Sequence, residues 1–512
     1  MSHFRYDPHH IPASLDPRVD PGLRHEFIRN ETRRQFFCQV GRGLGVAALS
    51  SLFSRSLMGA MAQAGNEGVL NPALLQLPHM APKAKRAIFL VMAGGPSQLD
   101  TWDYKPTMQY DMDMPLSVLG GGFELRMGMA GTQARFPVQP SIFKFQQHGK
   151  ARTWVSDLLP WTAKVVDDLA VINSMHADSV NHDPALTAML TGNTQQGKPS
   201  MGSWISYGLG SMNENLPTFM VLTSKWVDNP GEAIFSRLWG SGFLPPSHGG
   251  VSFRTDGGDP VLYINDPAGM DRAQKRMLLD GVQALNQATY EEVGDPETHA
   301  RIEGYEMAFR LQSSVPELTD VSKEPAETFE LYGPNSRIPG TFAHNCLLAR
   351  RMAERGVRFT QIFHRGWDHH GKLPEKLPKF CQDVDQPSYA LITDLKRRGL
   401  LDDTLVFWGG EFGRTPYSEG KSSTREAYGR DHHPKCFTMW AAGGGIKPGI
   451  VYGESDEFSY KPVRDPVHVR DFHATILHQL GLDHNRLTFR SQGLDQKLTG
   501  TTPAKVVRGL IA

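Results

Sequence analysis

The stretch AIFLVMAGGPSQLDTWD, residues 87–103, decides the fold, because in it an uninterrupted apolar run leads into a polar, glycine-containing turn. The run Ala87–Ala93 has the length of a strand and does not alternate between apolar and polar residues, which is typical of a strand buried on both faces of a parallel sheet. The turn carries Asp100 and Asp103. In open α/β sheets, ligands bind beyond the carboxyl ends of the strands, so the same stretch indicates where the chemistry is expected.

Five further apolar runs of the same character predict additional strands of this sheet. They cover Leu169–Ser174, Thr218–Thr223, Val357–Phe363, Thr404–Trp408 and Phe437–Ala442. Helical stretches at Phe342–Arg355 and Ser388–Arg398 each end at a glycine, the usual residue just past a helix end, and lead into the next strand. We therefore predict an α/β fold, with a doubly wound, mostly parallel sheet covered by helices on both faces. The polar segment 271–314 is predicted to be a helical insertion beside the sheet.

Residues 1–64 have the pattern of a polar leader that ends in a twin-arginine signal. Arg33-Arg34 precedes two phenylalanines, a weakly apolar stretch covers Leu44–Phe53, and Ala62-Gln63-Ala64 gives a small-x-small cleavage motif. We expect export through the twin-arginine pathway, a mature domain over residues 65–512, and a periplasmic or extracellular location. The apolar stretch is shorter than the roughly 20 residues that a permanent membrane helix needs.

Bulk composition limits the partners that we expect. The chain has 54 Lys and Arg residues against 54 Asp and Glu residues, so its formal net charge is zero. A neutral chain without a long basic run gives no reason to expect nucleic acid as a partner. The cysteines form no CxxC pair, so they predict no structural zinc module and are interpreted as buried apolar residues. They are Cys38, Cys346, Cys381 and Cys436.

Polar clusters follow three of the predicted strands and precede a fourth. The first is the turn after Ala93; the others are HRGWDHHG at residues 364–371, GGEFGR at 409–414 and GRDHHP at 429–434. Carboxylates and imidazoles that converge from separate strand ends are the groups that a hydrolytic metal site requires.

A fifth element, Asn181-His182-Asp183-Pro184, precedes a short helix that Gly192 ends. Asp183 is predicted to be the N-cap, and Pro184 the first helical residue. Asn181 and His182 would then lie at a helix N-terminus, which favours an anion. The alternative is that His182 only satisfies a carbonyl of its own loop.

In this order, the five elements resemble the alkaline phosphatase, phosphoglycerate mutase and sulfatase superfamily. More closely, the chain resembles an exported, sulfatase-like bacterial family catalogued as domain of unknown function 1501. The stretches that carry the resemblance are MAGGPSQLDTWD, VNHDPALTAMLTG, GWDHHGK, FWGGEFGRTP, GRDHHP, GGGIKPGIVYGESDE and DFHATILHQLGLDH. They span nearly the whole of the predicted mature chain.

The resemblance implies one or two divalent metal ions. Their implied ligands are Asp100 (with Asp103 as an alternative), Asp368, His370, Glu411, and His432 or His433. Such ligands leave zinc, manganese, calcium and magnesium open.

Two departures from the superfamily pattern bear on the chemistry. Sulfatases carry Cys-x-Pro-Ser-Arg where this chain reads His182-Asp183-Pro184-Ala185-Leu186, so formylglycine chemistry is not expected, and the Ser or Thr nucleophile of phosphatases is also missing. Phe412 replaces the histidine of an Asp-His pair.

The sequence therefore supports two functions. The first is a metal-dependent hydrolase of phosphate or sulfate esters, on small molecules or polysaccharides, in which His182 and Asn181 bind the anion or take part in the chemistry. Arg414 would clamp an oxyanion or, equally, form a surface salt bridge. The second is an inactive binding or surface-assembly protein on the same scaffold, which the loss of the nucleophile favours. The oligomeric state is not predicted.

Overall fold

The structure is a computed structural model, and all statements on structure refer to the residues that it describes. These are residues 77–115, 117–119, 133, 135–225, 233–255, 260–261, 270–293, 296–419 and 424–512. The twin-arginine motif, the cleavage motif and Cys38 lie outside them.

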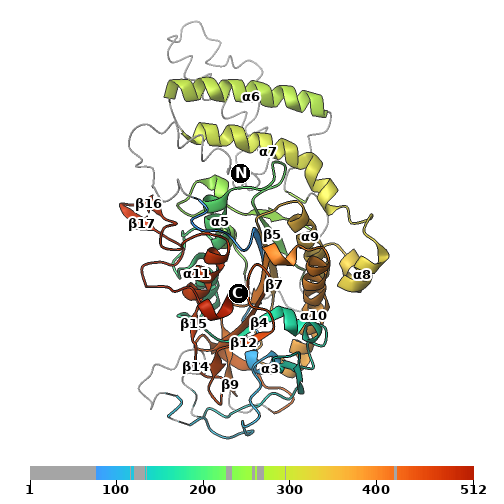
Figure 1. The fold of residues 1–512 in the computed structure, drawn as a ribbon, viewed down its shortest axis with the longest axis vertical. Helices are drawn as coiled ribbons and strands as arrows, with labels where there is room; N and C mark the ends of the chain where they lie inside the picture. The colour runs from blue at the N-terminus through green and yellow to red at the C-terminus, as the bar shows by residue number, and fades with distance from the viewer. Residues whose placement is uncertain are drawn as a thin grey trace, which may run out of the picture.

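The centre of the fold is a nine-stranded sheet with the order β12-β4-β11-β8-β1-β7-β5-β6, in which β15 also pairs with β4 (Figure 1). All six predicted strands belong to it, and the predicted α/β fold class is confirmed. The strands are β1 (Arg86–Ala93), β4 (Leu169–His176), β5 (Phe219–Thr223), β6 (Val251–Phe253), β7 (Phe359–Arg365), β8 (Thr404–Gly409), β11 (Phe437–Ala442), β12 (Ile450–Tyr452) and β15 (Val467–His468).

The sheet is mostly parallel, and β11 is the exception. It pairs antiparallel with both of its neighbours, β4 and β8, whereas β1 pairs parallel with β7 and β8. Residues that precede a reversed strand lie at the edge where the parallel strands end. The GRDHHP stretch, which comes before β11, therefore reaches the same edge as the turns that follow β1, β7 and β8.

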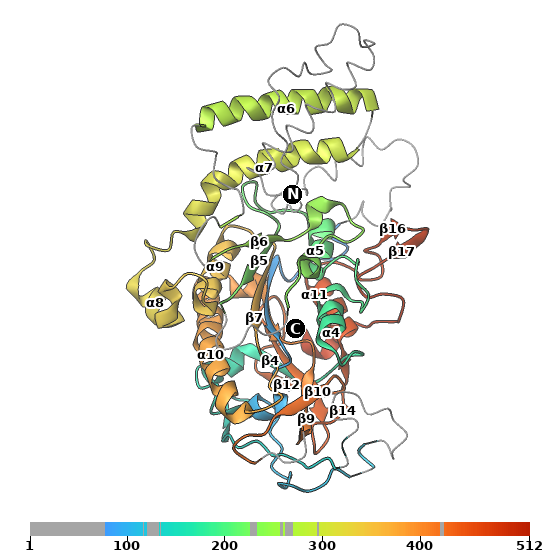
Figure 2. The ribbon, with the colours of Figure 1, turned by 180° about the vertical axis from the view of Figure 1, so that it is seen from behind.

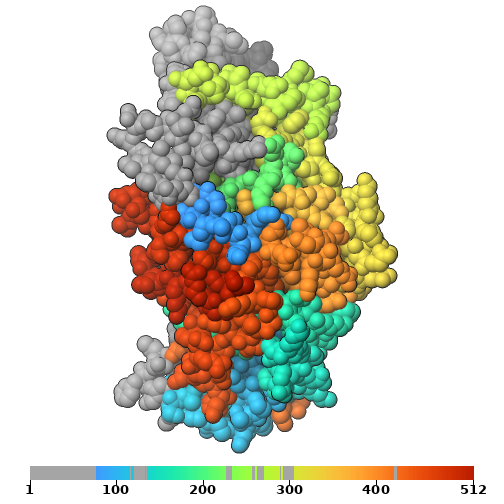
Figure 3. Space-filling view, in the orientation of Figure 1, coloured from blue at the N-terminus to red at the C-terminus, as the bar shows by residue number. Residues whose placement is uncertain are grey.

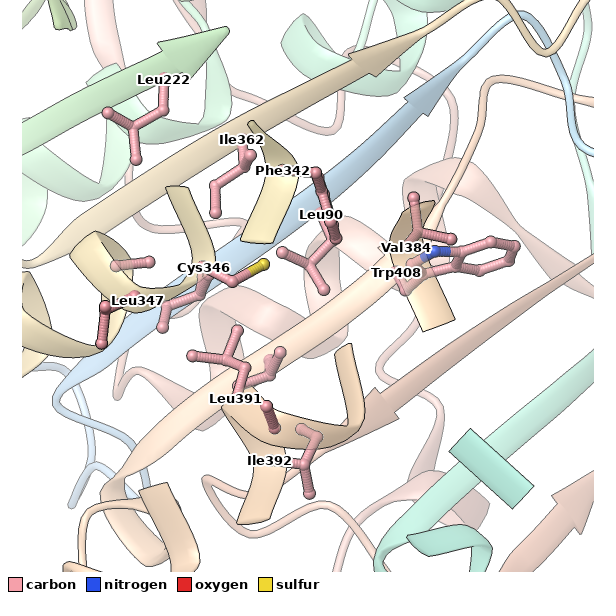
Figure 4. Packing of buried hydrophobic residues seen from close by; sticks show 14 of the residues in the cluster. Leu90, Leu222, Phe342, Cys346, Leu347, Ile362, Val384, Leu391, Ile392 and Trp408 are labelled. Carbon is pink, nitrogen blue, oxygen red and sulfur yellow. The ribbon is translucent and has the colours of Figure 1, made fainter. Parts of the chain in front are cut away.

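Helices cover both faces of the sheet. Figure 2 shows α9 (Phe342–Glu354) and α10 (Leu373–Arg397) on one side, and α4 (His182–Thr191), α5 (Met201–Leu209) and α11 (Val469–Gln479) on the other. The side chains of β1 alternate between the two layers, as the two-residue period of a strand requires. Leu90 packs with Cys346 of α9 and Leu391 of α10, as Figure 4 shows, whereas Phe89 belongs to the core on the opposite face.

Helix α10 is longer than the sequence pattern predicts. We expected a helix over Ser388–Arg398, but α10 begins at Leu373 and contains Pro378 and Pro387 in its interior. A proline inside a helix costs roughly 3 kcal/mol. Burial of the apolar face of α10 outweighs that cost, because one fully buried large apolar side chain contributes about 1.5–3 kcal/mol and several are available. They are Leu373, Leu377, Phe380, Val384, Leu391, Ile392 and Leu395.

The segment predicted as an insertion forms two long helices, α6 (Arg272–Val293) and α7 (Pro296–Thr319). They lie side by side, and Arg276 of α6 donates to Glu306 of α7 at 2.9 Å. In the space-filling view, the yellow-green atoms of these helices lie at one end of the molecule, away from the red C-terminal part (Figure 3). Among the described residues, no helix combines the length and the apolarity needed to cross a bilayer.

The remaining elements are short. They are α3 (Gln98–Thr101), α8 (Ala326–Tyr332), β2 (Phe145–His148), β3 (Thr153–Ser156), β9 (Gly413–Ser418), β10 (Arg430–His433), β13 (Glu454–Ser455), β14 (Pro462–Arg464), β16 (Phe489–Ser491) and β17 (Leu494–Gln496). The antiparallel pair of β9 and β10 lies at the end of the molecule opposite to α6 (Figure 2). The three described cysteines, Cys346, Cys381 and Cys436, are buried, as expected, and they are free.

Candidate metal centre

Four side chains bring one donor atom each to a common point. They are His182, Asp368, His370 and His432, and their donor atoms all lie within 4.8 Å of one another. The Oδ1 atom of Asp368 lies 2.8 Å from Nε2 of His370, 3.1 Å from Nε2 of His432 and 3.3 Å from Nε2 of His182. The Nε2 atoms of His370 and His432 are 3.0 Å apart.

The fold explains why residues so far apart in the chain meet here. His182 is the first residue of α4, which follows β4, and Asp368 and His370 lie in the turn after β7. His432 lies in β10, just before the reversed strand β11. All four positions therefore lie at the carboxyl edge of the parallel strands, where α/β sheets bind ligands.

Helix α4 begins two residues earlier than predicted, because Asn181 rather than Asp183 is the N-cap residue. The first helical hydrogen bond runs from the Ala185 amide to the Asn181 carbonyl, at 2.9 Å. Pro184 is tolerated in the first turn because the amides there have no partner within the helix. Asp183 instead pairs with Arg237. The earlier start makes His182 itself part of the helix N-terminus.

Each of the three histidines is held by an acceptor at Nδ1. Glu411 Oε1 lies 2.7 Å from Nδ1 of His182, the Val180 carbonyl lies 2.8 Å from Nδ1 of His432, and Glu419 contacts Nδ1 of His370. Carboxylates and carbonyls only accept, so each Nδ1 carries a proton. In the neutral imidazoles, the lone pair is then on Nε2, which is the atom aimed at the common point. Metal-binding histidines are oriented in this way.

The arrangement fits a divalent cation. A tetrahedral ion with bonds of about 2.0–2.1 Å needs donors about 3.3 Å apart. The four separations given above run from 2.8 to 3.3 Å, within a donor group whose atoms all lie within 4.8 Å of one another. The Nε2 atoms of His370 and His432, which are 3.0 Å apart, require either a shared proton or a cation between them. The residues present therefore match the donor set, spacing and orientation of a metal centre.

The pKa values show how strongly these groups favour positive charge at the common point. Burial lowers the pKa of His182, but the carboxylates of Asp368 and Glu411 outweigh it and raise the pKa to about 9. His370 has a pKa of about 9 for the same reason, with Asp368 and Glu419 as its partners. Burial raises the pKa of Asp368, but its three histidine neighbours and Arg414 hold it far below the usual range. A metal would replace protons at these positions.

Phe412 takes the position where the superfamily pattern expects a histidine. Its ring centroid lies 4.9 Å from that of His182 and 4.7 Å from that of His432. It is buried. Phe412 therefore supplies no donor, and it packs against two of the rings that do.

Arg414 holds Asp368 in place. Its Nη2 atom lies 2.6 Å from Asp368 Oδ1, its Nε donates to the Gly95 carbonyl at 2.9 Å, and its Nη1 donates to the Arg430 carbonyl at 3.0 Å. The side chain is 1% exposed. Because its donors are bound to protein acceptors and it is shut off from solvent, Arg414 is placed to position Asp368 rather than to clamp an oxyanion.

The structure does not bring Asp100 into the donor group. Its carboxylate pairs with Arg430 Nε at 2.8 Å and accepts hydrogen bonds from Tyr428 at 2.9 Å and Ser97 at 2.6 Å. Burial raises the pKa of Asp100, but the charge of Arg430 and these hydrogen bonds outweigh it and lower the pKa. The alternative, Asp103, is also buried, and it pairs with Lys105 at 3.1 Å.

Glu411 and His433 also lie outside the donor group, although both are adjacent to it. Glu411 is on the far side of the His182 ring, where it also accepts a hydrogen bond from the Gly94 amide at 2.9 Å. His433 faces away from His432, because successive strand residues point to opposite sides. Its Nε2 lies 2.5 Å from the Tyr460 carbonyl, and burial lowers its pKa to about 4.

Sequence reasoning missed Glu419 and Asp431. Together with His370 they form a second group of close donor atoms. Asp431 lies inside the GRDHHP stretch, directly before His432, so its place next to a candidate ligand could have been used to predict it. Glu419 follows β9 and belongs to no quoted motif, and no pattern in the sequence connects it with His370.

Comparison with known proteins identifies the family. Residues 84–511 match the model of a family described as "Protein of unknown function (DUF1501)". The chain belongs to this family. The match confirms the resemblance inferred from the motifs and covers nearly all of the described structure. The comparison with curated proteins finds no match.

Several solved structures are similar over most of the chain. A TAB5 alkaline phosphatase variant with bound magnesium has 11% identity and a TM-score of 0.33, over 78% of this chain and 99% of that one. A protein in the alkaline phosphatase superfamily from Vibrio parahaemolyticus has 10% identity and a TM-score of 0.33, over 85% and 75%. The PsFucS1 sulfatase from Pseudoalteromonas sp. has 14% identity and a TM-score of 0.30, over 85% and 71%. At such values the likeness carries no argument about activity.

Proposed function

We propose that this chain is a metal-dependent hydrolase of phosphate or sulfate esters, with His182, Asp368, His370 and His432 as its metal ligands. One observation carries the proposal. Three Nε2 atoms, each fixed by an acceptor at Nδ1, meet Asp368 Oδ1 at a point that solvent reaches. The side chains of Asp368 and His370 are 29% and 23% exposed. Part of the donor group is therefore open to solvent.

Three nitrogen donors and one carboxylate favour zinc, or another metal of similar softness, over calcium and magnesium, which prefer oxygen ligands. When bound, such an ion polarises an ester oxygen and lowers the pKa of water. The chain supplies the orientation of the ligands: Phe412 packs against two of the histidine rings, and Arg414 holds Asp368.

The start of α4 supplies a position for the anionic part of the substrate. The amides of His182 and Asp183 have no partner within the helix, and the helix dipole favours negative charge there. Asn181 is exposed, and its side chain does not cap the helix, so its amide group is available to the ester. His182 acts as a ligand rather than a nucleophile in this proposal, because both of its ring nitrogens are engaged. Water is then the attacking group.

The test combines metal content with turnover. Protein purified without chelators is measured by elemental mass spectrometry and then assayed on 4-nitrophenyl phosphate, bis(4-nitrophenyl) phosphate and 4-nitrophenyl sulfate. We expect one tightly held metal per chain, with both metal and turnover lost in Asp368→Ala and His370→Ala. His433→Gln is the matched control, because it changes the neighbouring histidine that faces away, and it is expected to keep both.

Two results would contradict the proposal in different ways. A folded protein that takes up no zinc, even when zinc is added in excess, would remove the metal centre. A protein that holds zinc tightly but hydrolyses none of the three esters would leave the alternative, a metal-containing binding or surface-assembly protein.

A further inference from the structure

Glu411 lies directly behind His182 and is enclosed by protein. It follows β8, and its side chain is 0% exposed. One of its oxygens, Oε1, lies 2.7 Å from His182 Nδ1 and 2.9 Å from the Gly94 amide, and Oε2 lies 3.2 Å from the same amide. Among the described residues, His182 is its only ion-pair partner.

A buried carboxylate without a permanent cation beside it is costly, so a function for Glu411 is expected. The contrast with Asp100 is direct, because Asp100 is equally buried but is paired with Arg430. Glu411 is instead paired with the histidine whose opposite nitrogen, Nε2, faces the donor group. A cation bound there would offset the charge of Glu411 through the imidazole ring.

The hydrogen bonds of Glu411 determine both the proton position and the orientation of the His182 ring. An ionised carboxylate only accepts, so the proton must be on Nδ1, and in the neutral ring Nε2 presents its lone pair. The Gly94 amide holds the carboxylate from the other side. Gly94 has φ = +115°, a region that favours glycine, and this conformation is part of the turn after β1. The turn after β1 therefore acts on His182 through Glu411.

We propose that Glu411 is a positioning residue, which fixes the Nδ1–H form and the plane of His182 for the metal and is not itself a ligand. This inference rests on the proposed metal centre. It differs from the ligand role that the family resemblance implies for Glu411, because His182 occupies the space between Glu411 and the other donors.

Glu419 provides an internal comparison, since it holds Nδ1 of His370 in the same way. The Glu419 side chain is 18% exposed, so water can replace it when it is removed. No such replacement is open to the fully enclosed Glu411. The loss of Glu411 should therefore affect the centre more than the loss of Glu419.

The experiment measures the zinc affinity of the full chain by competition with a chelator, in Glu411→Ala, Glu411→Gln, Glu419→Gln and Asp368→Asn. Loss of an orienting partner typically lowers metal affinity by about 10–100-fold, and we expect that loss in Glu411→Ala. Glu411→Gln keeps a side-chain oxygen that can accept from both Nδ1–H and the Gly94 amide, so it should recover most of the affinity. Glu419→Gln should lose the least.

A second measurement separates positioning from a merely structural role. Nitrogen-15 spectra of the histidine rings report whether His182 Nδ1 carries a hydrogen-bonded proton. We expect that proton in the wild type and in Glu411→Gln, both metal-free and zinc-loaded, and its loss in Glu411→Ala. If Glu411→Ala does not fold, Glu411→Gln still tests whether Glu411 is a ligand. A loss of zinc affinity equal to that of Asp368→Asn would make Glu411 a ligand and overturn the proposal.

Unchanged zinc affinity and an unchanged Nδ1 signal in Glu411→Ala would also overturn it. Failure of the proposed function has a different signature. If the wild type binds no zinc or hydrolyses no ester, the function falls, whereas the spectra of the metal-free protein still test what Glu411 does to His182.

Discussion

Two aspartate–arginine pairs lie at the same edge of the sheet, and they differ in what surrounds them. Asp100 follows β1 and pairs with Arg430, and Asp368 follows the neighbouring strand β7 and pairs with Arg414. Both arginines come from the β9–β10 pair and are buried. Asp100 is 0% exposed, whereas Asp368 is 29% exposed and faces three histidines.

The difference shows what separates a structural ion pair from a candidate metal ligand. The acceptor sites of Asp100 are met by fixed donors, namely Arg430, Tyr428 and Ser97. Asp368 faces histidines whose Nε2 protons a metal can replace, so a bound metal can satisfy the group as a whole. Asp100 and Asp368 are both carboxylates that follow a parallel strand, and the neighbours of each determine its role.

Stability gives the largest expected contrast. Asp100→Ala should lower the free energy of unfolding of the metal-free protein by about 3–5 kcal/mol, because it leaves Arg430 buried without its partner. Asp368→Ala should lower it by less than about 2 kcal/mol, because Arg414 keeps carbonyl acceptors. Urea unfolding in the presence of a chelator measures both. Equal losses in the two variants would remove the distinction between the pairs.

Metal affinity should reverse that order. Asp368→Ala removes a ligand and should weaken zinc binding by about 100-fold, which corresponds to about 2.7 kcal/mol. Asp100→Asn, which keeps the size of the side chain, should change zinc affinity by less than about threefold, since Asp100 lies outside the donor group. Competition with a chelator gives both values. A large loss in Asp100→Asn, in protein shown to be folded, would restore Asp100 as a ligand.

Acid pH should reveal the smallest contrast. The pKa of Asp100 is lowered from its ordinary value of 3.8. Its ionisation therefore contributes stability above that value, and the contribution is lost as the pH falls through the lower, folded-state pKa. Urea unfolding between pH 7 and pH 3 should show a steeper acid decline in the wild type than in Asp100→Asn, by at most about 1.4 kcal/mol per pH unit.

The acid decline assigned to Asp100 should be the same with and without zinc, because Arg430 rather than a metal balances its charge. The acid decline is therefore measured for the wild type and for Asp100→Asn, each once with zinc and once with chelator. If zinc abolishes the difference between the wild type and Asp100→Asn, the two carboxylates are coupled and are not independent.

Much of the fold could be predicted from the sequence, because buried parallel strands leave continuous apolar runs such as Ala87–Ala93. The edge that carries the site could also be predicted, since Asp368, His370 and His432 follow or precede such runs. The roles of Asp100 and Glu411 could not. The partner of Asp100 is Arg430, 330 residues away. No local pattern shows that Glu411 lies behind a histidine ring rather than in front of it.

Local rules failed where packing opposed them. A helix was expected only over Ser388–Arg398, but α10 also includes the stretch before it with two prolines, because the burial of its apolar face overrides their cost. At α4, Pro184 was expected to mark the first helical position. The first turn of a helix tolerates proline at several positions, because its amides have no partner within the helix. Pro184 takes the third position of α4, which begins at His182.

The reversed strand β11 has a consequence for the order in which the protein can be assembled. In the sheet, β4 is joined to β8 only through β11. His182 follows β4, and His432 precedes β11. Asp368 follows β7, which lies in the same half of the sheet as β8. Insertion of this one strand therefore unites the two halves of the sheet and completes the set of ligands in the same step. A nascent chain that has not yet produced residues 432–442 lacks one of the proposed ligands and the strand that brings the others together, so the proposed centre can take up a metal only after these residues have been synthesised.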